Sequence, residues 1–224
     1  MAHDERHGRR LDSFAAVLWD MDGTLVDTEP YWFEAELELA ERYGASWSTA
    51  EALELVGWDL LDAGRHLRDR MGIDLSPERI VDELLDSVTE RVERAVPWRP
   101  GARELLASLR GADVPCALVT MSYATFAKPI IGALPPDTFE VVVTGDAVDN
   151  GKPHPEPYLV AARDLDVLAA DCLAIEDSDT GARSAAAAGC TVLCVPLHVA
   201  VPPGPRRVFA DTLAGLGPAS RLPA

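Results

Sequence analysis

The sequence predicts an α/β protein with a doubly wound parallel sheet and a small all-helical segment inserted after the first strand. From about residue 98 to residue 200, short apolar runs alternate with helical patterns, which is typical of parallel strands joined by helical crossovers. The first apolar run, 14–19, is separated from these by the stretch 28–97, in which helical patterns occur without a convincing strand.

The expected elements follow from these patterns in chain order. The expected strands are 14–19, 116–120, 139–143, 172–175 and 191–195, and the helices expected between them are 102–109, 123–131, 158–165 and 181–188. In the inserted stretch, helices are expected over 31–42, 53–56, 60–71 and 77–96, with Glu29 and Pro30 as a favourable start to the first of them. Residues 203–224, rich in proline, glycine and alanine, are expected to run irregularly over the surface.

We expect three segments in the domain organisation. A flexible tail covers 1–13, a core domain is formed by 14–27 together with 98–224, and a helical domain covers 28–97. At 224 residues the chain is long enough to bury a full core and to carry such an insert.

Composition and charge limit the classes of molecule that the protein is expected to bind. The chain is 48% hydrophobic and 25% charged, as in globular proteins, and has no apolar run of membrane-spanning length. Its formal net charge of -17 argues against nucleic acid and anionic membrane surfaces, because both require basic patches. We expect no partner of either kind and a monomer or weak homo-oligomer.

The four cysteines predict a reducing compartment. Cys116, Cys172, Cys190 and Cys194 are scattered, and no two form a Cys-x-x-Cys pair. Three of them lie in or beside strand-like runs, which indicates buried, reduced thiols in a cytoplasmic protein.

Two aspartates stand where the first strand ends. Asp20 and Asp22 follow the apolar run 14–19, and Gly23 then allows a ligand to approach the backbone closely. Parallel α/β sheets bind ligands at the carboxyl ends of their strands. An ordinary turn would use the same residue types, so the pattern needs support from the later strand ends.

Later strand ends carry further polar residues. Thr120 ends one strand, although a helix cap would use it equally well, and Glu176 and Asp177 end another. Lys152, one of only two lysines, lies in a loop braced by Pro153, which restricts its backbone.

In this order the four segments resemble the motifs of the haloacid dehalogenase-like (HAD) superfamily. The matching runs are Asp-Met-Asp-Gly-Thr-Leu-Val-Asp at 20–27, Val-Thr-Met-Ser at 119–122, Gly-Lys-Pro-His-Pro-Glu-Pro-Tyr at 151–158 and Ile-Glu-Asp-Ser-Asp-Thr-Gly-Ala at 175–182. The position of the helical insert is similar to subfamily I with a C1 cap domain at 28–97. Within it, the chain resembles the branch of β-phosphoglucomutases and 2-deoxyglucose-6-phosphate phosphatases.

Charge repulsion among the expected carboxylates predicts a metal ion. Two like charges about 4 Å apart repel by about 4 kcal/mol at an effective dielectric near 20. Carboxylate oxygens converging at one sheet edge therefore favour a hard cation, and Mg²⁺ also coordinates substrate phosphate.

The resemblance assigns roles to these residues. It implies that Asp20 forms an aspartyl-phosphate, that Asp22 acts as general acid and base, and that Thr120 and Lys152 stabilise the transferring phosphoryl group. It also implies metal ligation by Asp20, Asp22, Glu176 and Asp177, and contacts of Gly23, Met121 and Ser122 with the phosphate. The activity implied is a Mg²⁺-dependent phosphatase acting on a small phosphorylated metabolite.

The start of the insert favours a sugar or polyol phosphate. The run 27–32, Asp-Thr-Glu-Pro-Tyr-Trp, resembles the Asp-Ser-Glu-Pro-x-Trp run of hexitol and 2-deoxyglucose-6-phosphate phosphatases. Glu29, Trp32 and Trp58 are therefore the expected substrate contacts of the cap. Aromatic packing inside a small helical domain explains each tryptophan equally well.

Two alternatives stay open. In β-phosphoglucomutases a histidine follows the first motif and a lysine and an arginine of the cap grip the second phosphate. Here Trp32 stands at the histidine position and the cap has no lysine, although Arg65, Arg68 or Arg70 could substitute. A catalytically inactive scaffold that acts as a binding protein is the other alternative, and the presence of all the motif residues disfavours it.

Overall fold

The computed structural model describes residues 8–55, 58 and 60–223 and divides the chain into two compact units. The larger unit combines 1–27 with 98–224, and the smaller one is 28–97. Each is described by itself below.

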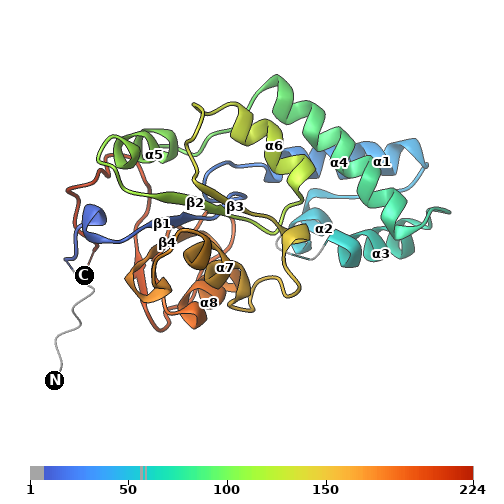
Figure 1. The fold of residues 1–224 in the computed structure, drawn as a ribbon. Helices are drawn as coiled ribbons and strands as arrows, with labels where there is room; N and C mark the ends of the chain where they lie inside the picture. The colour runs from blue at the N-terminus through green and yellow to red at the C-terminus, as the bar shows by residue number, and fades with distance from the viewer. Residues whose placement is uncertain (1–7, 56–57, 59, 224) are drawn as a thin grey trace. The chain divides into compact units, whose positions relative to one another are not determined.

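A six-stranded parallel sheet forms the centre of the larger unit (Figure 1). Its strands, in the spatial order β3-β2-β1-β4-β5-β6, are β3 (Val141–Val143), β2 (Cys116–Val119), β1 (Val17–Trp19), β4 (Leu173–Glu176), β5 (Thr191–Cys194) and β6 (Arg207–Phe209). Every residue of β1, β2, β4 and β5 is buried. These strands therefore read as continuous apolar runs instead of alternating ones, since helices cover both faces.

Helices cover the two faces of this sheet in pairs. Figure 1 shows α5 (Ala102–Arg110) and α6 (Ala124–Gly132) on one face, and α7 (Glu156–Asp164) and α8 (Asp179–Ala188) on the other. Three short 3-10 turns complete the unit at Leu11–Ser13, Gly145–Ala147 and Ala169–Asp171. The expected α/β fold with a parallel, doubly wound sheet is confirmed.

The ends of α8 follow from local chemistry. The Ser178 hydroxyl accepts a hydrogen bond from the Gly181 N–H at 3.1 Å, which caps the amino end. Gly189 ends the helix with a φ of +100°, a left-handed conformation that glycine adopts without strain. Serine at the amino end and glycine at the carboxyl end are the residue types that helix caps favour.

The structure differs from the sequence-based expectation at the two ends of the chain. Residues 207–209 form β6 and pair with β5, where an irregular surface segment was expected. Residues 8–13, assigned to a flexible tail, are hydrogen-bonded to residues 218–222, and Leu11 is buried. The remainder of that tail, 1–7, lies outside the described residues. Both differences arise from contacts between distant segments, which local patterns do not reveal.

The smaller unit is helical over the residues described. Its helices are α1 (Glu29–Arg42), α2 (Thr49–Glu54), α3 (Leu60–Met71) and α4 (Pro77–Arg94), and α4 packs against both α1 and α3. Ser48 and Glu51 form a reciprocal capping box at the start of α2. This helix begins at Thr49, before the expected range 53–56, and ends within that range at Glu54; Val56 lies outside the described residues.

Two further features of the fold are the lengths of its helices and the state of its cysteines. No helix in the described part of the chain is both long and apolar enough to span a membrane. All four cysteines are buried and free.

Candidate active site

The candidate site lies at the carboxyl ends of β1 and β4, the two strands between which the strand order reverses. Asp20 follows β1 directly, and its N–H donates to the carbonyl of Ile175 in β4 at 3.0 Å. Glu176 is the last residue of β4. In doubly wound sheets this crevice is the usual ligand site, because the flanking loops diverge there.

Lys152 connects the first and last of the four motifs. Its ammonium group donates to Asp20 Oδ1 at 2.7 Å, to Glu176 Oε1 at 2.7 Å and to the carbonyl of Val119 at 2.9 Å. Burial alone would lower the pKa of Lys152, but the two carboxylates more than offset this and raise it. Lys152 is therefore a permanent cation at the bottom of the site.

Glu176 is the most enclosed carboxylate of the site. Its side chain is fully buried, and the Tyr158 hydroxyl donates to the same Oε1 that Lys152 contacts. Burial raises the pKa of Glu176, and the nearby charge of Asp20 adds to the increase. Gly181 makes room for the carboxylate, because a Cβ at this position would lie 1.9 Å from Oε1. The buried Glu176 carboxylate thus holds the Lys152 ammonium group in place.

Asp177 faces the turn that follows β1. A Cβ on Gly23, whose φ is +81°, would lie only 2.0 Å from Asp177 Oδ2, so glycine permits this approach. Burial raises the pKa of Asp177 well above its usual range, and the charges of Asp20 and Glu176 act in the same direction. The carboxylates of Asp20, Glu176 and Asp177 therefore repel one another at this site.

One oxygen in this cluster is unpartnered. Carboxylate atoms of Asp20, Glu176 and Asp177 lie within 4.8 Å of one another. Asp20 Oδ2 is buried and has no hydrogen-bond partner among the described residues. A buried anionic oxygen without a donor is costly, and a cation beside it would remove that cost. The residues present therefore fit a divalent metal ion with oxygen ligands.

Asp22 points to the end of β2. Its Oδ2 accepts a hydrogen bond from the Ser122 hydroxyl at 2.7 Å and a longer one from the Thr120 hydroxyl at 3.3 Å. Thr120 in turn accepts from the Ser122 N–H at 3.0 Å. The structure thus joins Asp22 to the second motif through two hydroxyl groups.

Met121, an expected phosphate contact, packs against the loop of the third motif. The N–H of Lys152 points to Met121 Sδ at 3.2 Å, and a Cβ on Gly151 would meet the same sulfur at 2.9 Å. The methionine side chain therefore supports the Lys152 loop.

The smaller unit contains the three remaining expected residues. Glu29 is the first residue of α1, Trp32 lies one turn further along it, and both are half-buried. Trp58 is 48% exposed and packs edge-to-face against His66, with ring centroids 5.5 Å apart. His66 also contacts Trp47, so these rings form one aromatic cluster within the unit.

Sequence reasoning missed three residues around the site. Arg99 is buried and donates through Nη1 to the carbonyls of Gly23 and Val195. Tyr158 supports Glu176, as described above, and His198 pairs with Asp27 at 2.8 Å. Of these three residues, only Tyr158 could have been identified from the sequence, because it lies within the third motif.

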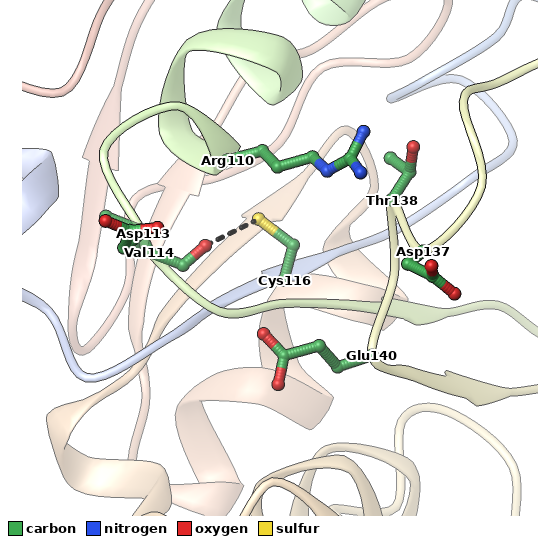
Figure 2. Close-up of a pocket in the computed structure, with 7 residues that line it drawn as sticks. All are labelled: Arg110, Asp113, Val114, Cys116, Asp137, Thr138 and Glu140. Atoms are coloured by element: carbon green, nitrogen blue, oxygen red, sulfur yellow. Dashed lines mark hydrogen bonds between the residues drawn. The ribbon is translucent and has the colours of Figure 1, made fainter.

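A separate pocket lies at the opposite edge of the sheet. It has a volume of about 260 Å³. Figure 2 shows three of its lining residues: Cys116, the first residue of β2, Arg110 and Glu140. Because it borders the amino ends of the strands, this pocket is distinct from the acidic cluster. Burial raises the pKa of the Cys116 thiol to about 12, so it is not a nucleophile at neutral pH.

Comparison with known proteins identifies the family. The family model for haloacid dehalogenase-like hydrolases matches residues 17–195, which include all four motif segments. The chain belongs to this family. Its members therefore supply the comparison for the geometry described above.

Two relatives are named for their action on phosphorylated carbohydrates and hexitols. A phosphorylated carbohydrates phosphatase of Thermotoga maritima is 32% identical over 175 residues, which cover 78% of this chain and 81% of the relative. Hexitol phosphatase A of Escherichia coli is 33% identical over 183 residues, covering 80% and 81%.

A solved structure has the same fold. The crystal structure of an aspartate-to-asparagine mutant of CbbY from Rhodobacter sphaeroides in complex with xylulose-(1,5)bisphosphate matches with a TM-score of 0.79 and 27% identity. The match covers 91% of this chain and 96% of that one.

Proposed function

We propose that this protein is a Mg²⁺-dependent phosphatase that hydrolyses a small sugar or polyol phosphate through an aspartyl-phosphate on Asp20. The observation that carries the proposal is the state of the Asp20 carboxylate. Lys152 holds one of its oxygens, and the other is buried without a partner among the described residues. Phosphatase relatives at 32% and 33% identity support the substrate class.

In the first step, Asp20 attacks phosphorus and the bond between phosphorus and the substrate oxygen breaks. Lys152 fixes Asp20 in position and balances part of its charge. Asp22 donates a proton to the leaving oxygen, so the product leaves as a neutral alcohol. The Ser122 and Thr120 hydroxyls hold the Asp22 side chain beside the phosphate position.

In the second step, water attacks phosphorus and restores the enzyme. Asp22, now a carboxylate, takes a proton from the attacking water, and the bond between Asp20 and phosphorus breaks. Inorganic phosphate is released and Asp22 is again protonated. Splitting the displacement into two steps lets one pair of aspartates serve both.

Four groups would hold the metal ion. They are Asp20 and Asp177 through their carboxylates, the backbone carbonyl of Asp22, and Glu176 through Oε2. Glu176 Oε1 already accepts from Lys152 and Tyr158, whereas Oε2 receives a longer hydrogen bond from the Ser178 hydroxyl at 3.3 Å. When bound, Mg²⁺ neutralises charge between the nucleophile and the phosphate. The donor set is all oxygen, as Mg²⁺ prefers.

We further propose that unit 28–97 is the cap that reads the leaving group, with Glu29, Trp32 and Trp58 as its substrate contacts. Exposed tryptophan faces suit the apolar faces of sugar rings.

The four free, buried thiols support a reducing compartment such as the cytoplasm.

The test is phosphate release with Mg²⁺ across hexose, hexitol, pentose and triose phosphates, with Asp20→Asn as the decisive variant. We expect turnover of sugar or polyol phosphates to fall by at least about a thousandfold in Asp20→Asn, because the amide is a poor nucleophile. Asp113→Asn, at the opposite edge of the sheet, is the control and should retain activity.

Two outcomes would contradict the proposal. Faster conversion of β-glucose 1-phosphate to the 6-phosphate than release of phosphate would identify a sugar phosphomutase. A wild-type protein that binds phosphorylated sugars but releases no phosphate would be an inactive scaffold.

A further inference from the structure

The segment 28–97 has an unusual balance of charge. It contains seventeen acidic residues, seven arginines and no lysine, so its formal net charge is -10. More than half of the charge of the whole chain, -17, therefore lies in this unit.

Every arginine of this unit forms an ion pair with a carboxylate of the same unit. The pairs are Arg42–Glu83, Arg65–Asp62, Arg68–Asp69, Arg70–Glu51, Arg79–Glu83, Arg91–Glu34, Arg91–Glu38 and Arg94–Glu90. The one histidine, His66, packs between the rings of Trp47 and Trp58.

The pairing is strongest where one residue has two partners. The Arg91 side chain, only 14% exposed, lies between Glu34 at 3.2 Å and Glu38 at 2.5 Å. Glu83 receives both Arg42 at 2.9 Å and Arg79 at 3.3 Å. Exposed ion pairs add little stability, but each one keeps a carboxylate against the cation. An anionic ligand that approached these guanidinium groups would meet those carboxylates as well.

Among the described residues, the core unit adds no free cation at the site. Lys152 is shared between Asp20 and Glu176, and Arg99 donates to two backbone carbonyls. In the described part of the chain, a substrate therefore finds one cationic side chain at the site, Lys152, which serves the phosphate that is transferred.

From this charge distribution we propose that the protein selects phosphate monoesters whose leaving group carries no negative charge, and rejects substrates with a second phosphate or a carboxylate. The inference rests on the proposed function, in which unit 28–97 reads the leaving group. Repulsion of wrong ligands is a general route to specificity. The solved relative that binds xylulose-(1,5)bisphosphate would differ from this chain in that respect.

The experiment compares substrates that share a skeleton and differ in charge. Sorbitol 6-phosphate and 6-phosphogluconate differ at the terminal carbon, where one has a hydroxyl and the other a carboxylate. Fructose 1-phosphate and fructose 1,6-bisphosphate differ by a second phosphate. We expect kcat/KM to be at least about tenfold higher for the member of each pair whose leaving group is uncharged, since like charges disfavour the member with the additional negative charge.

Salt distinguishes repulsion from steric exclusion. Raising the ionic strength from about 0.02 M to about 0.5 M shortens the screening length from about 20 Å to about 4 Å. The preference should therefore shrink several-fold. Effects of salt on the phosphate that both members carry cancel in the ratio.

Replacing single carboxylates by amides shows which part of the chain causes the repulsion. Glu83→Gln leaves Arg42 and Arg79 without their shared partner and should raise the relative kcat/KM for 6-phosphogluconate and for the bisphosphate. Glu140→Gln removes the same charge at the opposite edge of the sheet and is the matched control, with no expected change in the ratio.

Three results would overturn the inference. These are equal kcat/KM within the pairs at low salt, a preference that salt does not change, and equal effects of Glu83→Gln and Glu140→Gln. Each of these results can be interpreted only if the substrates with an uncharged leaving group are hydrolysed. If no substrate of either kind releases phosphate, the proposed function fails instead, so the two failures are distinguishable.

Discussion

Arg99 connects the turn after β1 with the loop after β5, although it belongs to neither. Through one nitrogen it donates to the carbonyls of Gly23 and Val195, and its own N–H donates to the carbonyl of Leu25 at 3.0 Å. Burial lowers the pKa of Arg99, and the charges of Asp177 and Asp27 counteract this. We interpret Arg99 as a positioning residue for this turn, which carries the proposed general acid Asp22.

Replacing Arg99 by methionine should therefore reduce activity as well as stability. Two buried carbonyls would lose their donor, at a cost of about 2–4 kcal/mol in the free energy of unfolding. Because the turn carries Asp22 and Gly23, kcat should fall at least about tenfold, with a smaller change in KM. Urea unfolding and steady-state kinetics measure the two effects.

The matched control is Arg207→Met. Arg207 is also buried, and it donates to Asp179 and to the carbonyl of Pro202, away from the catalytic turn. It should lose comparable stability but keep kcat within about twofold. Similar loss of kcat in both variants would mean that Arg99 has only a structural role.

Among the secondary-structure elements, α1 carries a buried carboxylate in the middle of its packed face. Glu36 is 5% exposed and accepts a hydrogen bond from the Trp47 indole at 2.8 Å. Burial raises the pKa of Glu36 to about 7, and the hydrogen bond from Trp47 only partly counteracts this. The folded smaller unit therefore binds a proton more tightly here than the unfolded chain does.

The sign of the pH dependence follows. Glu36 contributes its full stabilisation when both states are protonated, below its ordinary pKa of 4.5, and loses it as the pH rises through about 7. The loss is on the order of 3 kcal/mol in the free energy of unfolding. Glu36→Gln, which keeps an acceptor for Trp47, should remove this decline between about pH 5 and about pH 8.

Chemical unfolding of the wild type and the variant over this pH range measures the difference. Glu41→Gln, an exposed position at the end of the same helix, serves as the control and should leave the decline unchanged. Parallel curves for the wild type and Glu36→Gln would contradict this explanation.

For the molecule as a whole, a strongly acidic chain also brings three carboxylates together where the metal would bind. A net charge of -17 means that any cation stabilises the protein to some extent by screening. Coordination by Asp20 and Asp177 predicts a larger effect that is specific to Mg²⁺. At about a hundred times its dissociation constant, Mg²⁺ should add about 2.7 kcal/mol to the free energy of unfolding.

Calorimetry with two reference salts separates the contributions. Sodium chloride at equal ionic strength and the putrescine dication screen charge without coordinating to carboxylates. Asp177→Asn should lose the increment specific to Mg²⁺ and be more stable than the wild type without metal, because one repelling carboxylate is removed. An equal increment from putrescine would contradict a metal site.

Local patterns predicted most of the elements for identifiable reasons. The apolar strands and their flanking helices are visible because each is continuous in the sequence. By contrast, β6 is a short segment that pairs only because β5 lies beside it, and residues 8–13 depend on the distant residues 218–222. Neither pairing has a signature in its own residues.

The amino-acid sequence alone determines the fold class, the order of the motifs and the residue types that meet at the strand ends. Strand periodicity and parallel topology direct Asp20, Glu176 and Asp177 to one edge of the sheet. Only the tertiary structure decides which atoms are then left without partners and which charges cancel. Hydrogen bonds and ion pairs depend on distances of a few ångströms between distant segments. Asp20 Oδ2 is left unpartnered among the described residues, and every arginine of unit 28–97 is paired, because of packing that no local pattern encodes.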